Sequence, residues 1–416
     1  MNAFGVAAEM LALHRGQWRP VQAVRERQWR LLESMLAHAY ETTPHYRAAF
    51  DDRGITPADI RAPDDLTRLP ILKKRNIRVP DRLFARGFKR ETLHKSFSSG
   101  STGEGATTYF DDRAWVVGRF LVKLRARLAC GLRPWHNVAL FQWIPNEPTF
   151  LRRRILRQLS FGVHEPLEQT ADSLVSFGPR ALYGFPSYLT RLAPVAKGRV
   201  RPRFVFTSGE LLTERTRATI ASGFGAEVFD IYGCTEVKEI AWECPARSGY
   251  HVNADSVFVE ILKEEEDGVP AGSIVVTSLV NRAMPLVRYL VGDTGSWIPE
   301  PCPCGRGLPL MRPSLGRQAD YFILPGGGEV SPYNVMDPVE ALHGVAQFEI
   351  VQDRADHAMV RVVPSPAFGQ ETRDEIVRGL GPVIPGMAIT IEVVESIRPE
   401  KSGKFRIVKN TAFSGG

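Results

Sequence analysis

The stretch SFSSGSTGEGATTYF, residues 96–110, sets small hydroxyl residues and glycines side by side. Glycine permits positive φ angles and a close approach of the backbone to a ligand, and hydroxyls with backbone N–H groups can surround a phosphate. A flexible surface turn has the same composition, so the stretch alone favours neither interpretation. It is not a G-x-x-x-x-G-K-[ST] loop, because Gly100 and Gly103 are too close together and no lysine follows. Its meaning depends on the rest of the chain.

The composition indicates a globular protein with a large core. Of 416 residues, 44% are hydrophobic and 24% are charged, and this length predicts two or more domains. The net charge of +7 suits a polyanionic ligand such as a nucleotide or coenzyme A. The arginines at 152–154 are interpreted as a solvated helix face. No zinc-finger, RRM or basic-zipper pattern occurs, so we expect no nucleic-acid partner.

Cysteine usage and hydropathy bear on the compartment. The short apolar stretch at the N-terminus contains Glu9 and has no basic region before it, and no apolar run is long enough to span a bilayer. Five cysteines, with Cys302 and Cys304 one residue apart, are typical of reduced thiols or a metal site. We therefore expect a cytoplasmic protein without a membrane partner, and a homodimer stays open as an alternative to a monomer.

Hydrophobic periodicity predicts an α/β fold of two domains. Residues 20–50 show helical spacing up to a turn at Pro44 and Tyr46, and from residue 138 short β-like runs alternate with helical or turn segments. This alternation indicates helices packed on a mostly parallel or mixed sheet. A Gly/Pro break at 321–332 precedes a compact tail with its own strands and helices. We predict a large domain over residues 1–319, with a helical segment at 1–90, and a small α/β domain over 320–416.

Three later stretches add candidate ligand-binding groups. FDIYGCTEV at 229–237 places Tyr232 and Glu236 in a loop after a strand. RYLVGDTG at 288–295 presents Asp293, whose carboxylate can accept hydrogen bonds from a ribose diol, and LGRQAD follows at 315–320. RPEKSGKFR at 398–406 places Lys404 in a loop where its ammonium can meet a phosphate. Taken singly, each is equally well explained as an ordinary strand end, turn or basic surface loop.

In this order the motifs SSGSTGEG, YGCTE, GD, GRQAD and SGKFR resemble the core motifs of the adenylate-forming superfamily, which includes acyl-CoA synthetases, luciferases and adenylation domains. Within it, the chain is most similar to the phenylacetate-CoA ligase family. The similarity covers nearly the whole chain, including residues 39–74, 181–193 and 348–352. The resemblance implies a two-step ligase: a carboxylate attacks the α-phosphate of ATP, pyrophosphate leaves, and the acyl group passes from the adenylate to a thiol or amine.

The resemblance also implies roles for individual residues. Lys404 would bridge the attacking carboxylate and the α-phosphate, Glu236 would hold Mg²⁺, and Asp320 would be the hinge of a mobile C-terminal domain. Thr102 and Glu236 join Lys404 as catalytic residues. The β- and γ-phosphates would be bound by Ser98, Ser99, Gly100, Ser101, Thr102 and Gly103. The adenine would be lined by Ser208, Gly209 and Glu210, with Tyr232 stacked near it beside Asp230, Gly233 and Thr235. The ribose would be bound by Asp293 and Arg317.

Three alternatives stay open for the step that follows nucleotide binding. Coenzyme A is the acceptor that the resemblance implies, but Glu104 and Gly105 depart from the family pattern of Lys or Gln followed by Pro, and LPGGGEV at 324–330 is unusually rich in glycine. Transfer to an amine or to a carrier-protein thiol is the second alternative. A nucleotide-binding protein without catalysis is the third, and the presence of Lys404, Glu236 and Asp293 argues against it.

Two further groups of residues are candidate sites. Trp143, Tyr183, Gly184, Phe185 and Pro186 offer aromatic walls for a small, flat carboxylic acid, with ordinary core packing as the alternative, favoured for Trp143. Three thiols and one imidazole satisfy the tetrahedral preference of structural Zn²⁺, and the resembled family carries a similar cluster. These zinc candidates are Cys244, His251, Cys302 and Cys304. Buried thiols and a surface histidine are the alternative.

Overall fold

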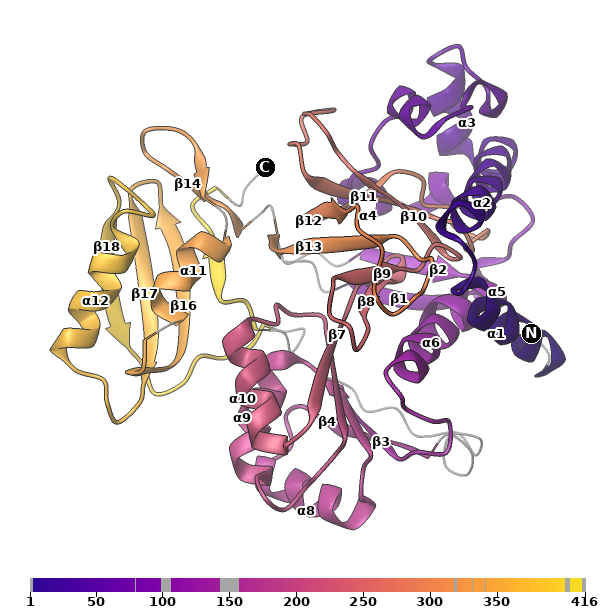
Figure 1. The fold of residues 1–416 in the computed structure, drawn as a ribbon. Helices are drawn as coiled ribbons and strands as arrows, with labels where there is room; N and C mark the ends of the chain where they lie inside the picture. The colour runs from indigo at the N-terminus through magenta and orange to yellow at the C-terminus, as the bar shows by residue number, and fades with distance from the viewer. Residues whose placement is uncertain are drawn as a thin grey trace.

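The computed structural model describes residues 3–78, 80–98, 106–142, 157–317, 320–330, 332–340, 342–400 and 405–413. Helices dominate the first part of the chain and lie together at one side of the molecule (Figure 1). They are α1 (Ala3–Gly16), α2 (Val21–Thr42), α3 (Pro44–Asp51) and α4 (Lys74–Arg78), with 3₁₀ turns η1 (Pro57–Asp59), η2 (Pro63–Arg68), η3 (Pro80–Leu83) and η4 (Arg90–Thr92). Helix α2 and nearly all of α3 fall within residues 20–50, where helical spacing predicts a helix.

Pro44 corrects one detail of the prediction. The expected turn at Pro44 and Tyr46 is the first turn of helix α3, with Thr43 as its N-cap and Pro44 at the first helical position. Proline is well tolerated there, because its missing N–H has no intrahelical partner and its φ angle already suits a helix. The helix buries Tyr46 and Phe50, whereas α2 buries Val24, Leu32 and Leu36 among other side chains.

An eleven-stranded mixed sheet forms the centre of the described structure, in the order β10-β11-β12-β13-β9-β8-β7-β6-β5-β3-β4. Neighbouring strands from β4 to β7 pair in parallel, and the remaining pairs are antiparallel. The strands are β3 (Val138–Gln142), β4 (Gln158–Gly162), β5 (Ala181–Gly184), β6 (Phe204–Ser208), β7 (Glu227–Cys234), β8 (Lys238–Glu243), β9 (Tyr250–Val252), β10 (Val257–Ile261), β11 (Ser273–Ser278), β12 (Tyr289–Ile298) and β13 (Leu310–Arg317).

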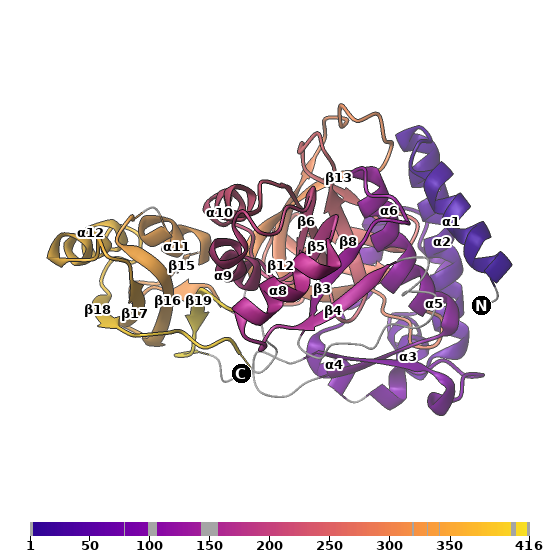
Figure 2. The same ribbon diagram turned by 90° about the horizontal axis from the view of Figure 1, so that it is seen from below.

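Helices cover both faces of the parallel strands, as the predicted α/β class requires (Figure 2). One face packs against α8 (Leu167–Phe177), α9 (Pro186–Ala196) and α10 (Glu214–Phe224), with Leu174, Leu189 and Ile220 in the shared core. The other face packs against α6 (Val122–Ala129), which follows α5 (Asp112–Val116) and a π-helical turn, η5 (Val117–Leu121). A hairpin of β1 (His94–Ser98) and β2 (Ala106–Phe110) precedes them.

The C-terminal part of the chain forms its own sheet and core. Four strands in the order β18-β17-β16-β19 pack against two helices, and Figure 1 shows this unit beside α9 and α10. Its elements are β14 (Phe322–Ile323), β15 (Glu329–Val330), α11 (Pro332–Glu340), β16 (Val345–Arg354), β17 (His357–Pro364), α12 (Gln370–Leu380), β18 (Ala388–Val393) and β19 (Val408–Asn410). Within the described ranges, no helix combines the length and the apolar character needed to cross a membrane.

Candidate active site

The tips of three parallel strands lie next to one another. Gly184 on β5 pairs in register with Thr207 on β6, and Ser208 on β6 pairs with Ile231 on β7. Tyr232 follows directly at the end of β7. Ligands of open α/β sheets bind outside the carboxyl ends of such strands, because the following loops converge there. The predicted residues Gly184, Ser208 and Tyr232 therefore share one edge of the sheet.

Tyr232 and Asp293 come together at this edge. The Tyr232 hydroxyl donates a hydrogen bond of 2.8 Å to Oδ2 of Asp293, which lies on β12. Both side chains are partly exposed. Asp293 pairs in register with Arg317 on β13, so the backbones of the two predicted ribose-binding residues are adjacent.

The β1–β2 hairpin holds the two ends of the predicted phosphate loop together. Ser98, the last residue of β1, pairs with Ala106, the first residue of β2. Ser99, Gly100, Ser101, Thr102 and Gly103 lie outside the described residues, as do Trp143 and Lys404.

A tight connection between β7 and β8 carries Thr235 and Glu236. Gly233 is required there, because a Cβ atom at this position would lie 2.4 Å from the Lys238 carbonyl oxygen. Glu236 is 5% exposed, and its Oε1 lies 3.8 Å from Nζ of Lys74. A carboxylate with this exposure and one distant cation retains oxygen lone pairs for a hard cation such as Mg²⁺.

Glu210 connects three separate segments. Its carboxylate accepts hydrogen bonds of 2.9 Å from both the backbone N–H and the hydroxyl of Ser187, in the first turn of α9. Oε1 also accepts a hydrogen bond of 2.6 Å from the backbone N–H of Phe405. The loop after β6, which begins with Gly209, therefore touches the residue that follows Lys404 in the chain. No local pattern in the sequence indicates this contact.

Asp230 differs from the other predicted nucleotide residues. Its side chain lies inside the sheet at 4% exposure and accepts hydrogen bonds of 2.5 Å from Thr207 and 3.1 Å from Tyr250. Burial raises the pKa of this carboxyl to about 7, and the neighbouring Glu243 carboxylate contributes to the rise. The Asp230 side chain thus makes its hydrogen bonds within the protein, and its contact with the nucleotide stays a prediction.

The zinc candidates form a compact cluster at the other end of β8. Cys244, His251, Cys302 and Cys304 each offer a ligand atom, and these four atoms lie within 4.8 Å of one another. Sγ of Cys244 lies 3.6 Å from Sγ of Cys302, and Sγ of Cys304 lies 3.3 Å from Nε2 of His251. Tetrahedral Zn²⁺ with Zn–S bonds of about 2.3 Å places its sulfur ligands roughly 3.8 Å apart. The residues present therefore fit zinc.

The protonation state of His251 suits a metal ligand. Burial lowers the pKa of this imidazole to about 4, so the ring is neutral at physiological pH. Only the neutral ring has a lone pair to give to a metal. The sulfur of Cys244 and that of Cys302 are too far apart for a disulfide bond, and both belong to free cysteines.

Comparison with known proteins places the chain in a family. A family model described as the CapK C-terminal domain matches residues 322–411. A phenylacetate-coenzyme A ligase of Thermus thermophilus is 30% identical over 385 residues, which cover 86% of this chain and 85% of the relative. The chain belongs to the phenylacetate-CoA ligase family. A ligase of the same name from Escherichia coli is 26% identical over 74% of each chain.

This phenylacetate-CoA ligase family member is an AMP-forming ligase of the adenylate-forming superfamily. Its fold is shared with a solved 2-hydroxyisobutyryl-CoA ligase in the postadenylation state, in complex with R3-HIB-AMP. That structure has a TM-score of 0.77 and 21% identity, and the match covers 95% of this chain and 91% of the other. The predicted fold class and family are both confirmed.

The predicted acid-binding residues of the ligase differ in exposure. The ring of Tyr183 is partly exposed, with Nζ of Lys123 4.5 Å and Cζ of Arg127 4.7 Å from its centroid. Phe185 is the N-cap residue of α9 and also partly exposed, whereas Gly184 and Pro186 are buried. Pro186 is buried in the core, whereas Tyr183 and Phe185 pack against the core and keep part of their surface exposed.

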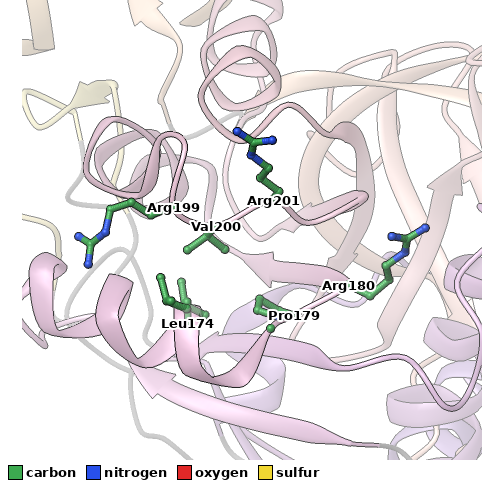
Figure 3. A pocket seen from close by; sticks show the side chains of 8 residues that line it. Leu174, Pro179, Arg180, Arg199, Val200 and Arg201 are labelled. Atoms are coloured by element: carbon green, nitrogen blue, oxygen red, sulfur yellow. The ribbon is translucent and has the colours of Figure 1, made fainter.

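A described cavity of about 220 Å³ lies away from these residues. Figure 3 shows Leu174 and Val200 at its apolar floor, with Arg180, Arg199 and Arg201 around it. Arg180 directly precedes β5, so the cavity lies at the amino ends of the parallel strands. Of the predicted nucleotide residues, Ser208 and Tyr232 lie toward the opposite, carboxyl ends of these strands. The cavity is therefore separate from the candidate active site.

Proposed function

We propose that this ligase activates a small aromatic carboxylic acid with ATP and Mg²⁺, forming an acyl-adenylate and pyrophosphate, and then transfers the acyl group to coenzyme A. The contact between Glu210 and the backbone N–H of Phe405 carries the proposal. It holds the segment next to Lys404 against the loop after β6, beside Tyr232 and Asp293. The relatives named phenylacetate-coenzyme A ligase support both the acid class and the acceptor.

Each group has a role that follows from its chemistry. Residues Ser98 to Gly103 would hold the departing phosphates through backbone N–H groups and hydroxyls, with Thr102 as a catalytic donor. Asp293 and Arg317 would bind the ribose hydroxyls, and Tyr232 would pack against the adenine. Glu236 would hold the Mg²⁺ that neutralises phosphate charge. The ammonium of Lys404 would stabilise the charge that develops between the carboxylate and the α-phosphate.

The aromatic acid class rests on Tyr183 and Phe185. Both rings are partly exposed close to the tips of β5 and β6, and flat apolar acids pack well between aromatic walls. The two cations at Tyr183 would favour a ring that is electron-rich or carries anionic groups. Comparing aryl acids with short-chain acids of equal charge tests this class.

The decisive experiment is acid-dependent release of pyrophosphate from MgATP across a panel of aryl and short-chain acids. We expect an aryl acid to trigger release, and Lys404→Ala to lower the rate by about 100-fold or more, because a preorganised charge in the transition state is lost. Lys263→Ala is the control, since this lysine side chain is 84% exposed and pairs with Asp64. ATP binding without release for every acid would contradict the proposal.

The acceptor is tested with the same reaction. Formation of acyl-coenzyme A at the same rate as pyrophosphate would support coenzyme A as the acceptor. An amide or a loaded carrier protein, with no acyl-coenzyme A, would instead support an adenylating enzyme of biosynthesis that ignores coenzyme A.

We further propose that the domain over residues 320–416 rotates about Asp320 between the two half-reactions. Asp320 forms an ion pair with Arg406, two residues after Lys404, and Thr213 on the large domain hydrogen-bonds Glu340. Rotation would have to break the contacts of Glu210 and Thr213. Asp320→Pro, which fixes φ, should keep pyrophosphate release and lose acyl transfer, whereas Asp320→Ala should keep both. Equal transfer by the two variants would contradict the hinge.

We also propose that Cys244, His251, Cys302 and Cys304 hold a structural Zn²⁺. Four protein ligands leave no open position, so the ion would join the loop after β8 to the segment before β13 and take no part in the reaction. Metal analysis should give one zinc per chain, and Cys304→Ser should lower both the zinc content and the unfolding temperature. Cys130→Ser is the control, because this buried thiol lies outside the cluster. A metal-free protein of unchanged stability would contradict the assignment.

A further inference from the structure

Lys238 occupies an unusual position next to the candidate active site. It is the first residue of β8 and adopts φ +68°, in the left-handed region that side chains other than glycine rarely enter. It pairs with Cys234 across the tight connection that carries Thr235 and Glu236. A non-glycine residue held in this conformation indicates that its side chain is needed in a particular place.

The ammonium group of Lys238 joins two segments that are far apart in the sequence. Nζ donates a hydrogen bond of 2.9 Å to the Thr235 carbonyl oxygen, within its own loop. Nζ also donates one of 2.5 Å to the hydroxyl of Ser96 on β1, 142 positions away. Ser96 lies two residues before the end of β1, where the predicted phosphate loop begins.

Aromatic rings enclose the same ammonium. Nζ lies 4.4 Å from the ring centroid of Phe110 on β2 and 5.3 Å from that of Trp115 on α5. The faces of aromatic rings attract a cation, most strongly where water is excluded. Gly118 leaves room for the stem, because a Cβ atom there would lie 3.3 Å from Cγ of Lys238. The position is therefore built for a charged lysine.

We propose that Lys238 is a positioning residue of the ligase: its ammonium couples strand β1, through Ser96, to the Thr235–Glu236 loop, so that these two segments keep a fixed relation to bound MgATP. The inference rests on the proposed function, because MgATP binding at these two segments is itself proposed. Lys238 acts through Ser96 and Thr235 and need not touch the reacting atoms.

Equilibrium binding of MgATP in the absence of any acid tests the inference, whichever acid the enzyme activates. Lys238→Met should raise the Kd for MgATP by about 10-fold at neutral pH, in the range expected when a hydrogen bond to a charged group is lost. Lys238→Arg, which keeps the positive charge, should recover part of the affinity.

Two controls separate positioning from folding and from general charge. Lys263→Met makes the same substitution at an exposed lysine and should leave the Kd unchanged. If Lys238→Met does not fold, Ser96→Ala keeps the lysine and removes one hydroxyl partner, and we expect a rise in Kd of about 3-fold. A wild type that does not bind MgATP would overturn the proposed function. Wild-type binding with an unchanged Kd in Lys238→Met, or in Ser96→Ala where that is the variant that folds, would overturn the inference alone.

Discussion

Each half of strand β7 contributes to a hydrogen bond between a tyrosine and an aspartate, but one pair is buried and the other is partly exposed. In the middle of the strand, Asp230 accepts hydrogen bonds from Tyr250 and Thr207 and is fully enclosed. Two residues further along the same face, Tyr232 donates to Asp293 at a partly exposed strand tip. Depth along a strand, more than residue type, therefore separates a stabilising tyrosine–aspartate pair from one that can meet a ligand.

The buried half is supported by an ion pair. Arg217 on α10 donates hydrogen bonds of 3.0 and 2.8 Å to the two oxygens of Glu243 on β8. Glu243 also accepts a hydrogen bond of 2.7 Å from the backbone N–H of Asp230. Each carboxylate oxygen therefore has a donor, which is the condition under which a buried charge is tolerated.

The largest effect is expected at this ion pair. Arg217→Met leaves the Glu243 carboxylate buried without its cation and should lower the free energy of unfolding by about 3 kcal/mol, measured by urea denaturation. Arg217 also lies 3.4 Å from Glu214, whose side chain is 87% exposed, and Glu214→Gln should cost less than about 1 kcal/mol. Equal losses in the two variants would show that the middle of β7 has no special dependence on the buried pair.

A second effect concerns the pH dependence of stability. The pKa of Asp230 is raised to about 7 in the folded state, so the folded protein binds more protons than the unfolded chain between the ordinary carboxyl pKa and about pH 7. Stability contributed by this group is therefore present at low pH and lost as the pH rises through that window, by up to about 1.4 kcal/mol per pH unit. Asp230→Asn should flatten the pH profile of the unfolding free energy. An identical slope in variant and wild type would mean that Asp230 ionises normally.

The smallest effect on stability is expected at the strand tip. Asp293→Asn should change the free energy of unfolding by less than about 0.5 kcal/mol and raise the Kd for ATP by about 10-fold, because a charged acceptor for the ribose is lost. Tyr232→Phe keeps the ring and removes only the hydroxyl, so a rise of about 3-fold is expected. If Asp293→Asn instead destabilised the fold and left ATP binding intact, the contrast between tip and middle would fail.

Apolar runs predicted much of the fold correctly. The β-like runs at 138–144, 203–210 and 273–279 contain β3, β6 and β11, because a strand buried on both faces must be apolar along its length. Strands β8 and β9 were not predicted, since glutamate, tryptophan and histidine interrupt their patterns. Glu239 and Glu243 on β8 pair with Lys123 on α6 and Arg217 on α10, and local periodicity carries no information about such partners.

The sequence by itself determined the order of the motifs, the α/β layers and the set of three thiols and one imidazole, because these depend on residue type and local pattern. Only the tertiary structure decided that Asp230 faces inward while Tyr232 meets Asp293, that Glu210 contacts Phe405, and that Lys238 reaches Ser96. Each of these outcomes depends on how deeply a side chain is buried and on a partner brought close by strand register or domain packing. Neither quantity is encoded within a short stretch of chain.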